Sequence, residues 1–357
     1  MKKKILCTLL AAAMVFSLAA CGASDTGNEN ASKETEEAVS QKNEGVESAG
    51  DYDKITMRVG NIYNESTTHG QALDLFQQEI EEKSGGAITV DMYHGGSLGS
   101  EQDHIQAQKE GSVELIFSGT AGIGLYVPAT AVFECFYAFE DISQIQEAVD
   151  TLYDDLDAAC QAEGFKLLGC FFDGPRQILS NKEITNIEDL KGLKLRAPGS
   201  NIYVNSISAL GAQAISMPLG DVYTSLQTGA IDAMEGTMDT ITQQKFYEQG
   251  KYIIMDSHVF QPLFVTYNLD AWNALSADTQ NLILECVSDA EKLQLSLHDT
   301  ALEEEYTACE DAGLKIMELT DRDKWIEAVK ETSAAYAKEN GELGQKIYSV
   351  IQDIQNK

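Results

Sequence analysis

Strand-like and helix-like segments alternate along most of this chain. Residues 54–61 alternate apolar and polar side chains, residues 67–83 place apolar side chains at helical spacing, and residues 87–93 are strand-like again. The same order returns later, with short strand-like segments at 194–196 and 231–234. Because strands that alternate with helices form sheets covered by those helices, this order predicts an α/β fold with parallel or mixed sheets.

The chain is expected to cross twice between two α/β lobes, and two such crossings together would form a hinge. The first crossing is predicted near 172–175, between strand-like residues 166–172 and 176–180, and the second near 259–264. The predicted parts are a first lobe at 52–174, a second lobe at 175–262, and a return strand, bridging helix and C-terminal helices at 263–357.

Residues 278–312 contain no glycine or proline and are rich in helix-forming residues. They predict a helix that is long for a globular protein. Such a helix could brace both lobes, and two helices separated by a kink are the alternative.

The N-terminus has the pattern of an export signal. Residues 2–4 are lysines, residues 5–20 are mainly apolar, and small residues precede Cys21. We predict a signal peptide at 1–20. The small residues before the cysteine resemble a bacterial lipobox, which implies a lipid on the Cys21 sulfur and a mature protein anchored to a membrane without spanning it. An ordinary signal peptide with an incidental cysteine is the alternative.

Residues 21–51 differ from the rest of the chain because they contain no aromatic residue and many Glu, Ser and Asn residues. Such a segment cannot bury enough apolar surface to offset its ordering entropy, so we predict a disordered acidic tether. No later apolar run reaches the roughly 18 residues of a membrane-spanning helix. We therefore expect no transmembrane helix.

The formal net charge of −32 argues against nucleic acid or anionic lipid as a partner. It does not exclude an anionic small molecule, since a pocket responds mainly to its nearest charges. The cysteines after Cys21 form no metal-binding cluster, and a disulfide framework is not expected, although one incidental pair is left open. They are interpreted as small buried hydrophobic residues: Cys135, Cys160, Cys170, Cys286 and Cys309.

Several signatures of catalysis are missing from the sequence. There is no His-Glu-x-x-His pair, no phosphate-binding loop and no dinucleotide fingerprint after a strand. We predict that the protein is not an enzyme and uses no cofactor or metal.

Two arginines are the most informative charged residues. Arg196 ends the strand-like segment 194–196, which Pro198 stops, and Arg176 lies just past the first crossing. If both reach a cleft between the lobes they form an anion site, because a guanidinium group binds a carboxylate through two parallel hydrogen bonds. A surface ion pair is the alternative for each arginine.

Four segments in order resemble the solute-binding subunits of tripartite ATP-independent periplasmic (TRAP) transporters. The resemblance extends from about residue 55 to the C-terminus. It rests on residues 69–115 (HGQALD…GSVEL), 174–198 (GPRQIL…KLRAP), 217–236 (MPLGDV…DAMEG) and 244–253 (QKFYEQGKYI).

The resemblance implies a two-lobed periplasmic-binding-protein-like fold with a hinge and a long helix spanning both lobes. It implies that Arg196 forms a salt bridge with a substrate carboxylate and that Arg176, twenty residues earlier, is a second arginine of the site. It also implies that the ligand passes to a membrane permease driven by an ion gradient.

This chain departs from the family pattern at two places. Many sialic-acid and dicarboxylate binders have a substrate-contacting asparagine where Gly236 stands here. A glutamate often found in the pocket after the third strand is also missing, since residues 116–120 read IFSGT. The candidate substrate-binding residues are Arg196, Arg176, Gly236, Asn61 and Glu235.

The expected ligand is a sugar acid or another small organic acid, with dicarboxylates close behind. A ligand-sensing lobe pair that feeds a signalling kinase is the first alternative function, and a surface hydrolase is the second.

Overall fold

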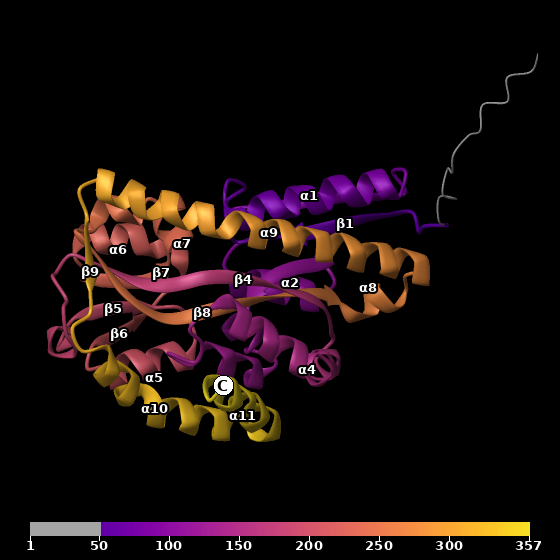
Figure 1. Cartoon of the computed structure of the whole chain (residues 1–357). Helices are drawn as coiled ribbons and strands as arrows, with labels where there is room; N and C mark the ends of the chain where they lie inside the picture. Colours follow the sequence, from indigo (N-terminus) through magenta and orange to yellow (C-terminus); the bar gives the residue numbers. More distant parts are fainter. Residues whose placement is uncertain (1–50) are drawn as a thin grey trace, which may run out of the picture. The chain divides into compact units, whose positions relative to one another are not determined.

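Nine strands form one mixed sheet in residues 51–357, the part of the chain that this computed structural model describes (Figure 1). The predicted signal peptide, the tether up to residue 50 and the lipid site Cys21 lie outside the described residues. The strand order is β2-β1-β3-β8-β4-β7-β5-β6, and β9 pairs with β8 beside this path. The strands are β1 (Ile55–Gly60), β2 (Ile88–Tyr93), β3 (Leu115–Gly119), β4 (Phe165–Ser180), β5 (Lys194–Ala197), β6 (Gln213–Ser216), β7 (Ala233–Thr237), β8 (Tyr252–Asn268) and β9 (Lys315–Glu318).

Helices cover both faces of the sheet, which confirms the predicted α/β fold. Helices α1 and α9 lie side by side over one face, and α4, α10 and α11 lie over the other (Figure 1). The α-helices are α1 (Thr68–Lys83), α2 (Glu101–Lys109), α3 (Thr120–Ile123), α4 (Ile142–Ala162), α5 (Asn201–Ala209), α6 (Val222–Thr228), α7 (Met238–Gln243), α8 (Leu269–Asn273), α9 (Ala277–Asp311), α10 (Arg322–Glu339) and α11 (Gly341–Gln355). Short 3₁₀ helices are η1 (Pro128–Glu134), η2 (Ile187–Leu190), η3 (Leu219–Asp221) and η4 (Phe246–Gln249).

The sheet has two parallel sections joined by two long antiparallel strands. In the first section β1 pairs with β2 and β3, and in the second section β5 pairs with β6 and β7. Strand β8 pairs with β3, strand β4 pairs with β7, and β4 and β8 pair with each other along most of their length. The two sections therefore belong to one continuous sheet.

The sequence predicted a strand break around residues 173–175, and this prediction is wrong. Strand β4 runs without interruption from Phe165 to Ser180, because the Asp-Gly-Pro segment is accommodated as an irregularity in the pairing with β8, between Phe172 and Pro175. The expected lobe boundary at residue 175 falls at this irregularity. Strand β8 likewise runs without interruption through the second predicted crossing, near residues 259–264.

Helix α9 confirms the prediction of one long helix, and the alternative of two helices is wrong. Its 35 residues correspond to a length of about 50 Å at the rise of an α-helix. The hydroxyl group of Ser276 caps its first turn by accepting a hydrogen bond from the backbone N–H of Thr279. The helix packs against α1, against β4 and against α7, so it contacts elements of both sections.

Apolar residues fill the space between the sheet and its helical layers. The five cysteines of the described residues are buried there as free thiols, so no disulfide pair forms among them. None of the helices in the described range is both long enough and apolar enough to cross a membrane.

Candidate functional site

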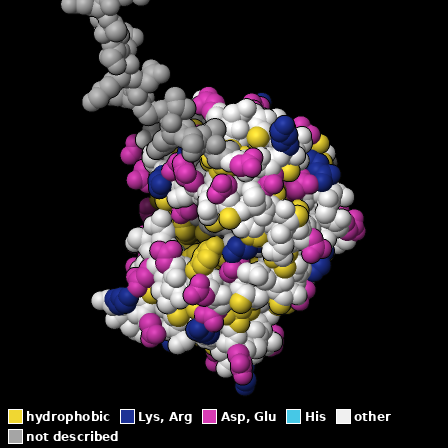
Figure 2. Space-filling view, turned by 90° about the vertical axis from the view of Figure 1, so that its right-hand side faces the viewer, with side chains coloured by type: hydrophobic (Ala, Val, Ile, Leu, Met, Phe, Trp, Pro, Cys, Tyr) yellow, Lys and Arg dark blue, Asp and Glu magenta, His cyan; other side chains and the backbone are white. Residues whose placement is uncertain are grey.

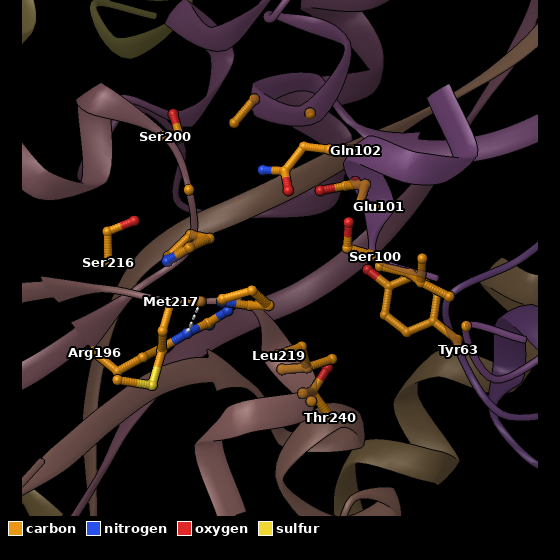
Figure 3. Close-up of a pocket in the computed structure, with 18 of the residues that line it drawn as sticks. Tyr63, Ser100, Glu101, Gln102, Arg196, Ser200, Ser216, Met217, Leu219 and Thr240 are labelled. Atoms are coloured by element: carbon orange, nitrogen blue, oxygen red, sulfur yellow. Dashed lines mark hydrogen bonds between the residues drawn. The ribbon is translucent and has the colours of Figure 1, made fainter. Parts of the chain in front are cut away.

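A cavity of about 590 Å³ opens between the two sections of the sheet. This volume lies within the range of small-molecule sites, roughly 300–1,000 Å³. Its walls come from the segments that follow β1, β2 and β3 on one side and β5, β6 and β7 on the other. Figure 3 shows side chains from both sides directed into the same space. Since open α/β sheets bind ligands beyond the carboxyl ends of their parallel strands, the cavity is the candidate ligand site.

Arg196 lines this cavity with hydrogen-bond donors that no described residue uses. It lies on β5 and is 4% exposed, and its Nε donates to the backbone oxygen of Met217 at 3.2 Å (Figure 3). None of the described residues accepts a hydrogen bond from its two terminal nitrogens, although Nη1 lies 3.6 Å from Oε1 of Glu235. Burial lowers the pKa of Arg196 to about 10, which leaves the side chain protonated at neutral pH.

Arg176 lines the same cavity, but its charge is already paired. Its Nε and Nη2 donate to the two carboxylate oxygens of Glu235, at 2.6 and 3.0 Å, and its Nη1 donates to Oε1 of Gln261 at 2.7 Å. The guanidinium also lies over the ring of Tyr203, 5.2 Å from its centre. Arg176 therefore acts mainly as part of the cavity wall.

His258 completes a buried charge network behind the arginines. Its Nε2 lies 3.2 Å from Oε2 of Glu235, and its Nδ1 lies 2.9 Å from Oδ2 of Asp256. Burial alone would lower the pKa of His258, but Asp256 and Glu235 outweigh it and raise the pKa to about 9. Burial would raise the pKa of Glu235, yet Arg176 and His258 lower it to about 2.

Three of the predicted site residues do not line the cavity. Asn61 is buried, and its Oδ1 accepts a hydrogen bond from the backbone N–H of Tyr63 at 3.0 Å, which shapes the turn after β1. Glu235 holds Arg176, as described above. A side chain at Gly236 would meet Met234 and Thr240, at 3.1 and 3.8 Å from its Cβ. The structure thus brings only Arg196 and Arg176 directly to the cavity.

Two acidic residues of the cavity wall were not predicted from the sequence. Glu101 is the first residue of α2, and Glu134 is the last residue of η1; both line the cavity. Glu134 accepts hydrogen bonds from Oγ1 of Thr120 at 2.7 Å and from the N–H of Ala121 at 2.6 Å. In sequence both residues look like ordinary residues at helix ends, and nothing in their spacing points to a site.

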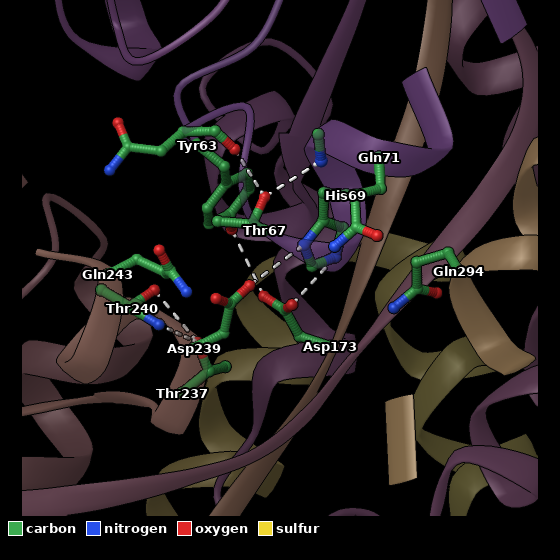
Figure 4. Close-up of polar contacts among 12 residues, drawn as sticks. Tyr63, Thr67, His69, Gln71, Asp173, Thr237, Asp239, Thr240, Gln243 and Gln294 are labelled. Carbon is green, nitrogen blue, oxygen red and sulfur yellow. Dashed lines mark hydrogen bonds and ion pairs between the residues drawn. The ribbon is translucent and has the colours of Figure 1, made fainter. Parts of the chain in front are cut away.

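A second polar cluster links α1 of the first section to α7 of the second (Figure 4). His69 of α1 is buried, with Nε2 3.0 Å from Oδ1 of Asp173 and Nδ1 3.8 Å from Oδ2 of Asp239. The ring of Tyr63 stacks on His69, and its hydroxyl donates to Asp173 at 3.3 Å. Because Tyr63 also lines the cavity, this cluster is adjacent to the candidate ligand site.

The glycine-rich loop after β2 contains one sequence that matches the spacing of a serine hydrolase motif, Gly95-Gly96-Ser97-Leu98-Gly99. Ser97 is exposed, and within the described range its hydroxyl forms no hydrogen bond with a histidine or any other residue. The residues of the described range also contain no group of His, Cys, Asp and Glu side chains that could hold a metal ion.

Comparison with known proteins identifies the family. Residues 59–340 match the model of bacterial extracellular solute-binding proteins, family 7. This chain belongs to that family. The predicted resemblance to TRAP solute-binding proteins is thereby confirmed, and the protein is an extracytoplasmic solute-binding protein with the two-lobed fold of its relatives.

Named relatives differ in the ligands that their names record. A solute-binding protein of Chromohalobacter salexigens is 28% identical over 298 residues, which cover 83% of this chain and 88% of that protein. The C4-dicarboxylate-binding protein DctB of Bacillus subtilis is 25% identical over 293 residues, which cover 80% of this chain and 83% of that protein. A TRAP solute-binding protein of Roseobacter denitrificans, solved with β-D-glucuronate, is 25% identical with a TM-score of 0.80, over 84% of this chain and 99% of that one.

Proposed function

We propose that this protein captures a small organic acid through Arg196 and delivers it to the membrane subunits of a TRAP transporter. The observation that carries the proposal is the pair of free terminal nitrogens of Arg196 in the cavity. A guanidinium presents these nitrogens in a fixed plane that matches a carboxylate. Acidic side chains are spread over the surface in Figure 2, so the arginines make the cavity a local exception to the acidic surface.

A sugar acid is the ligand class that we favour. The related structure from Roseobacter denitrificans holds β-D-glucuronate. Opposite Arg196 the cavity presents the side-chain amide of Gln102, which suits the hydroxyl groups of a sugar, while the hydroxyl groups of Tyr63 and Ser100 donate to Asp173 and Asp103 (Figure 3). The protein acts by binding and release and performs no chemical step on the acid.

The direct test is a calorimetric titration of the purified protein with matched ligands. D-glucuronate should bind, whereas its methyl ester, which keeps the sugar but lacks the negative charge, should not bind measurably. If no acid from a broad thermal-shift screen of organic acids binds, the proposed function is wrong. If the acid is converted into a product during the titration, the protein is an enzyme and the receptor proposal fails.

Delivery to a permease is tested in cells. Uptake of the labelled acid should require both this protein and the permease encoded beside it. If uptake is the same without this protein, or if the neighbouring gene encodes a sensor kinase that responds to the acid, the transport role is contradicted.

We also propose that a lipid on Cys21 holds the protein at the membrane surface. The support is the sequence alone, since small residues precede this cysteine at the end of the apolar segment. Wild-type protein should partition into the detergent phase, and the Cys21→Ser variant should remain in the aqueous phase. Equal partitioning of the two proteins would contradict the lipid anchor.

A further inference from the structure

Glu101 places a carboxyl group in the cavity on the side opposite Arg196 (Figure 3). Glu101 belongs to the first turn of α2, and its carboxyl group lies beside the last residues of β3. Its Oε1 accepts hydrogen bonds from the backbone N–H of Gly119 at 2.8 Å and from Oγ of Ser118 at 3.3 Å. A carboxylate is therefore present after the third strand, although residues 116–120 contain no acidic residue.

The position of this carboxyl group is fixed on one side only. A Cβ atom at Gly122 would lie 2.6 Å from Cδ of Glu101, so only a glycine leaves room for the carboxyl group there. Among the described residues none donates a hydrogen bond to its Oε2. One oxygen is thus held by the protein, and the other is available to a ligand.

The charges around the cavity match a ligand with a single carboxylate. Two of the three positive groups, Arg176 and His258, are paired with Glu235 and Asp256. Arg196 is the remaining one. Its Nη1 lies 3.6 Å from Oε1 of Glu235, which already accepts a hydrogen bond from Arg176, so the terminal nitrogens of Arg196 can bind one carboxylate of a ligand. Burial raises the pKa of Glu101 to about 7, with Glu134 adding to the effect, so this region of the cavity already disfavours negative charge.

We propose that Glu101 is a specificity-determining residue that selects acids with one carboxylate and an uncharged, hydroxyl-bearing remainder. Its Oε2 accepts a hydrogen bond from a ligand hydroxyl, and the same carboxyl group repels a second carboxylate at that position. This proposal rests on the proposed function, because it assumes that Arg196 binds the first carboxylate. It separates this receptor from relatives that bind dicarboxylates.

The test compares two acids that differ at one carbon. D-galactonate ends in a hydroxymethyl group where galactarate ends in a second carboxylate. In calorimetric titrations at pH 8, wild-type protein should bind D-galactonate at least about tenfold more tightly than galactarate, because the charged Glu101 repels the second carboxylate of galactarate. Glu101→Gln, which keeps the shape of the side chain and removes its charge, should bring the two affinities within about threefold of each other.

Two further variants separate charge from fold. Glu110→Gln removes the same charge at the exposed end of α2 and should keep the wild-type ratio of affinities. Glu101→Asp keeps the charge but shortens the reach, so it should still reject galactarate while binding D-galactonate more weakly than wild type. Melting temperatures of all variants show whether each protein is folded.

The outcomes distinguish this inference from the proposed function. If wild type binds acids but prefers galactarate, or if Glu101→Gln leaves the ratio unchanged, the role of Glu101 is wrong and the receptor function stands. If no acid binds to wild type, both are wrong.

Discussion

Arg196 is the side chain on which ligand affinity should depend most. Removing one partner of a buried charge pair costs about 2–5 kcal/mol, which corresponds to a loss of about 30-fold to several thousand-fold in affinity. We expect a loss of this size for Arg196→Ala with the best acid, measured by calorimetry. Arg196→Lys should also bind poorly, because a point charge cannot reproduce the planar donor pair. A folded Arg196→Ala protein that binds within a few-fold of wild type would contradict the anchor role.

Arg176 should matter more for stability than for ligand contact. Its guanidinium is paired with Glu235 in a buried site, so Arg176→Ala removes the two hydrogen bonds to this carboxylate and leaves it with His258 and Arg196 as its only positive neighbours among the described residues. Breaking a buried pair from one side typically costs about 3–5 kcal/mol. We expect a loss of that order in the free energy of unfolding by urea denaturation. Combining it with Glu235→Gln should recover part of the loss, and an additive effect of the two changes would show that the pair does not act as a unit.

At the residue scale, the sequence located the two arginines of the site but could not show which of them is paired with a carboxylate. Arg196 was predicted because a strand end followed by Pro198 places a side chain at the mouth of the sheet, and this depends on local pattern alone. The pairing of Arg176 with Glu235 depends on the register of β4 and β7, which connects residues 59 positions apart. The role of Glu101 could not be predicted either, because its carboxylate lies beside Gly119 only when α2 packs against the end of β3.

At the scale of elements, Gln294 fastens the long helix α9 to the irregular part of β4. Its Nε2 donates to the backbone oxygen of Phe172 at 2.8 Å, and its side chain is fully buried. Gln294→Ala would leave that carbonyl group without a partner, at a cost of about 1–3 kcal/mol in the free energy of unfolding. Asn281→Ala on the exposed side of α9 is the matched control and should change stability by less than about 0.5 kcal/mol. Equal effects of the two variants would contradict this role.

Elements with a strong local pattern were predicted well, and the two crossing strands were not. Helix α9 could be predicted because 35 residues without glycine or proline admit few other structures. Strand β4 was divided because Asp173, Gly174 and Pro175 are typical turn residues. Proline is nevertheless tolerated in a sheet where the pairing is irregular, and the pairing of β4 with β8 shifts at this point. Only the neighbouring strand decides between a turn and such an irregularity, and it is distant in sequence.

At the scale of the whole molecule, contacts of residues at and just before the start of α1 with α7 and β4 connect the two sections of the sheet beside the cavity. Ser66 donates to Oε1 of Gln243 at 2.7 Å, and His69 lies between Asp173 and Asp239. A hinge motion that separated the sections would break these contacts, because hinge motions reorient lobes without refolding them. Ligand should therefore favour the arrangement in which they are made, and small-angle scattering should show a smaller radius of gyration with saturating acid.

His69 makes this equilibrium dependent on pH. Burial alone would lower its pKa, but Asp173 and Asp239 outweigh burial and raise the pKa to about 10. Glu305 of α9 is held in its protonated form by burial and by the same two aspartates, with a pKa raised to about 9. Both groups bind a proton more tightly in the described arrangement than in water. The bound protons therefore stabilise the arrangement in which the sections are joined. This stabilisation is complete below the ordinary pKa of each group, and it is lost as the pH rises through the raised pKa values of about 9 for Glu305 and about 10 for His69.

The variant His69→Asn tests whether the charged contact of His69 joins the two sections. His69→Asn removes the charged contact at a residue that does not itself line the cavity. It should therefore shift the unliganded protein toward separated sections and weaken the binding of every acid by the same factor. Its affinity should also fall less than that of wild type between pH 7 and pH 10. The measurements are calorimetry with D-galactonate and galactarate at several pH values and scattering without ligand. A variant that changed the ratio of the two affinities, as Glu101→Gln is expected to do, would place His69 in ligand selection and would contradict a role in joining the sections.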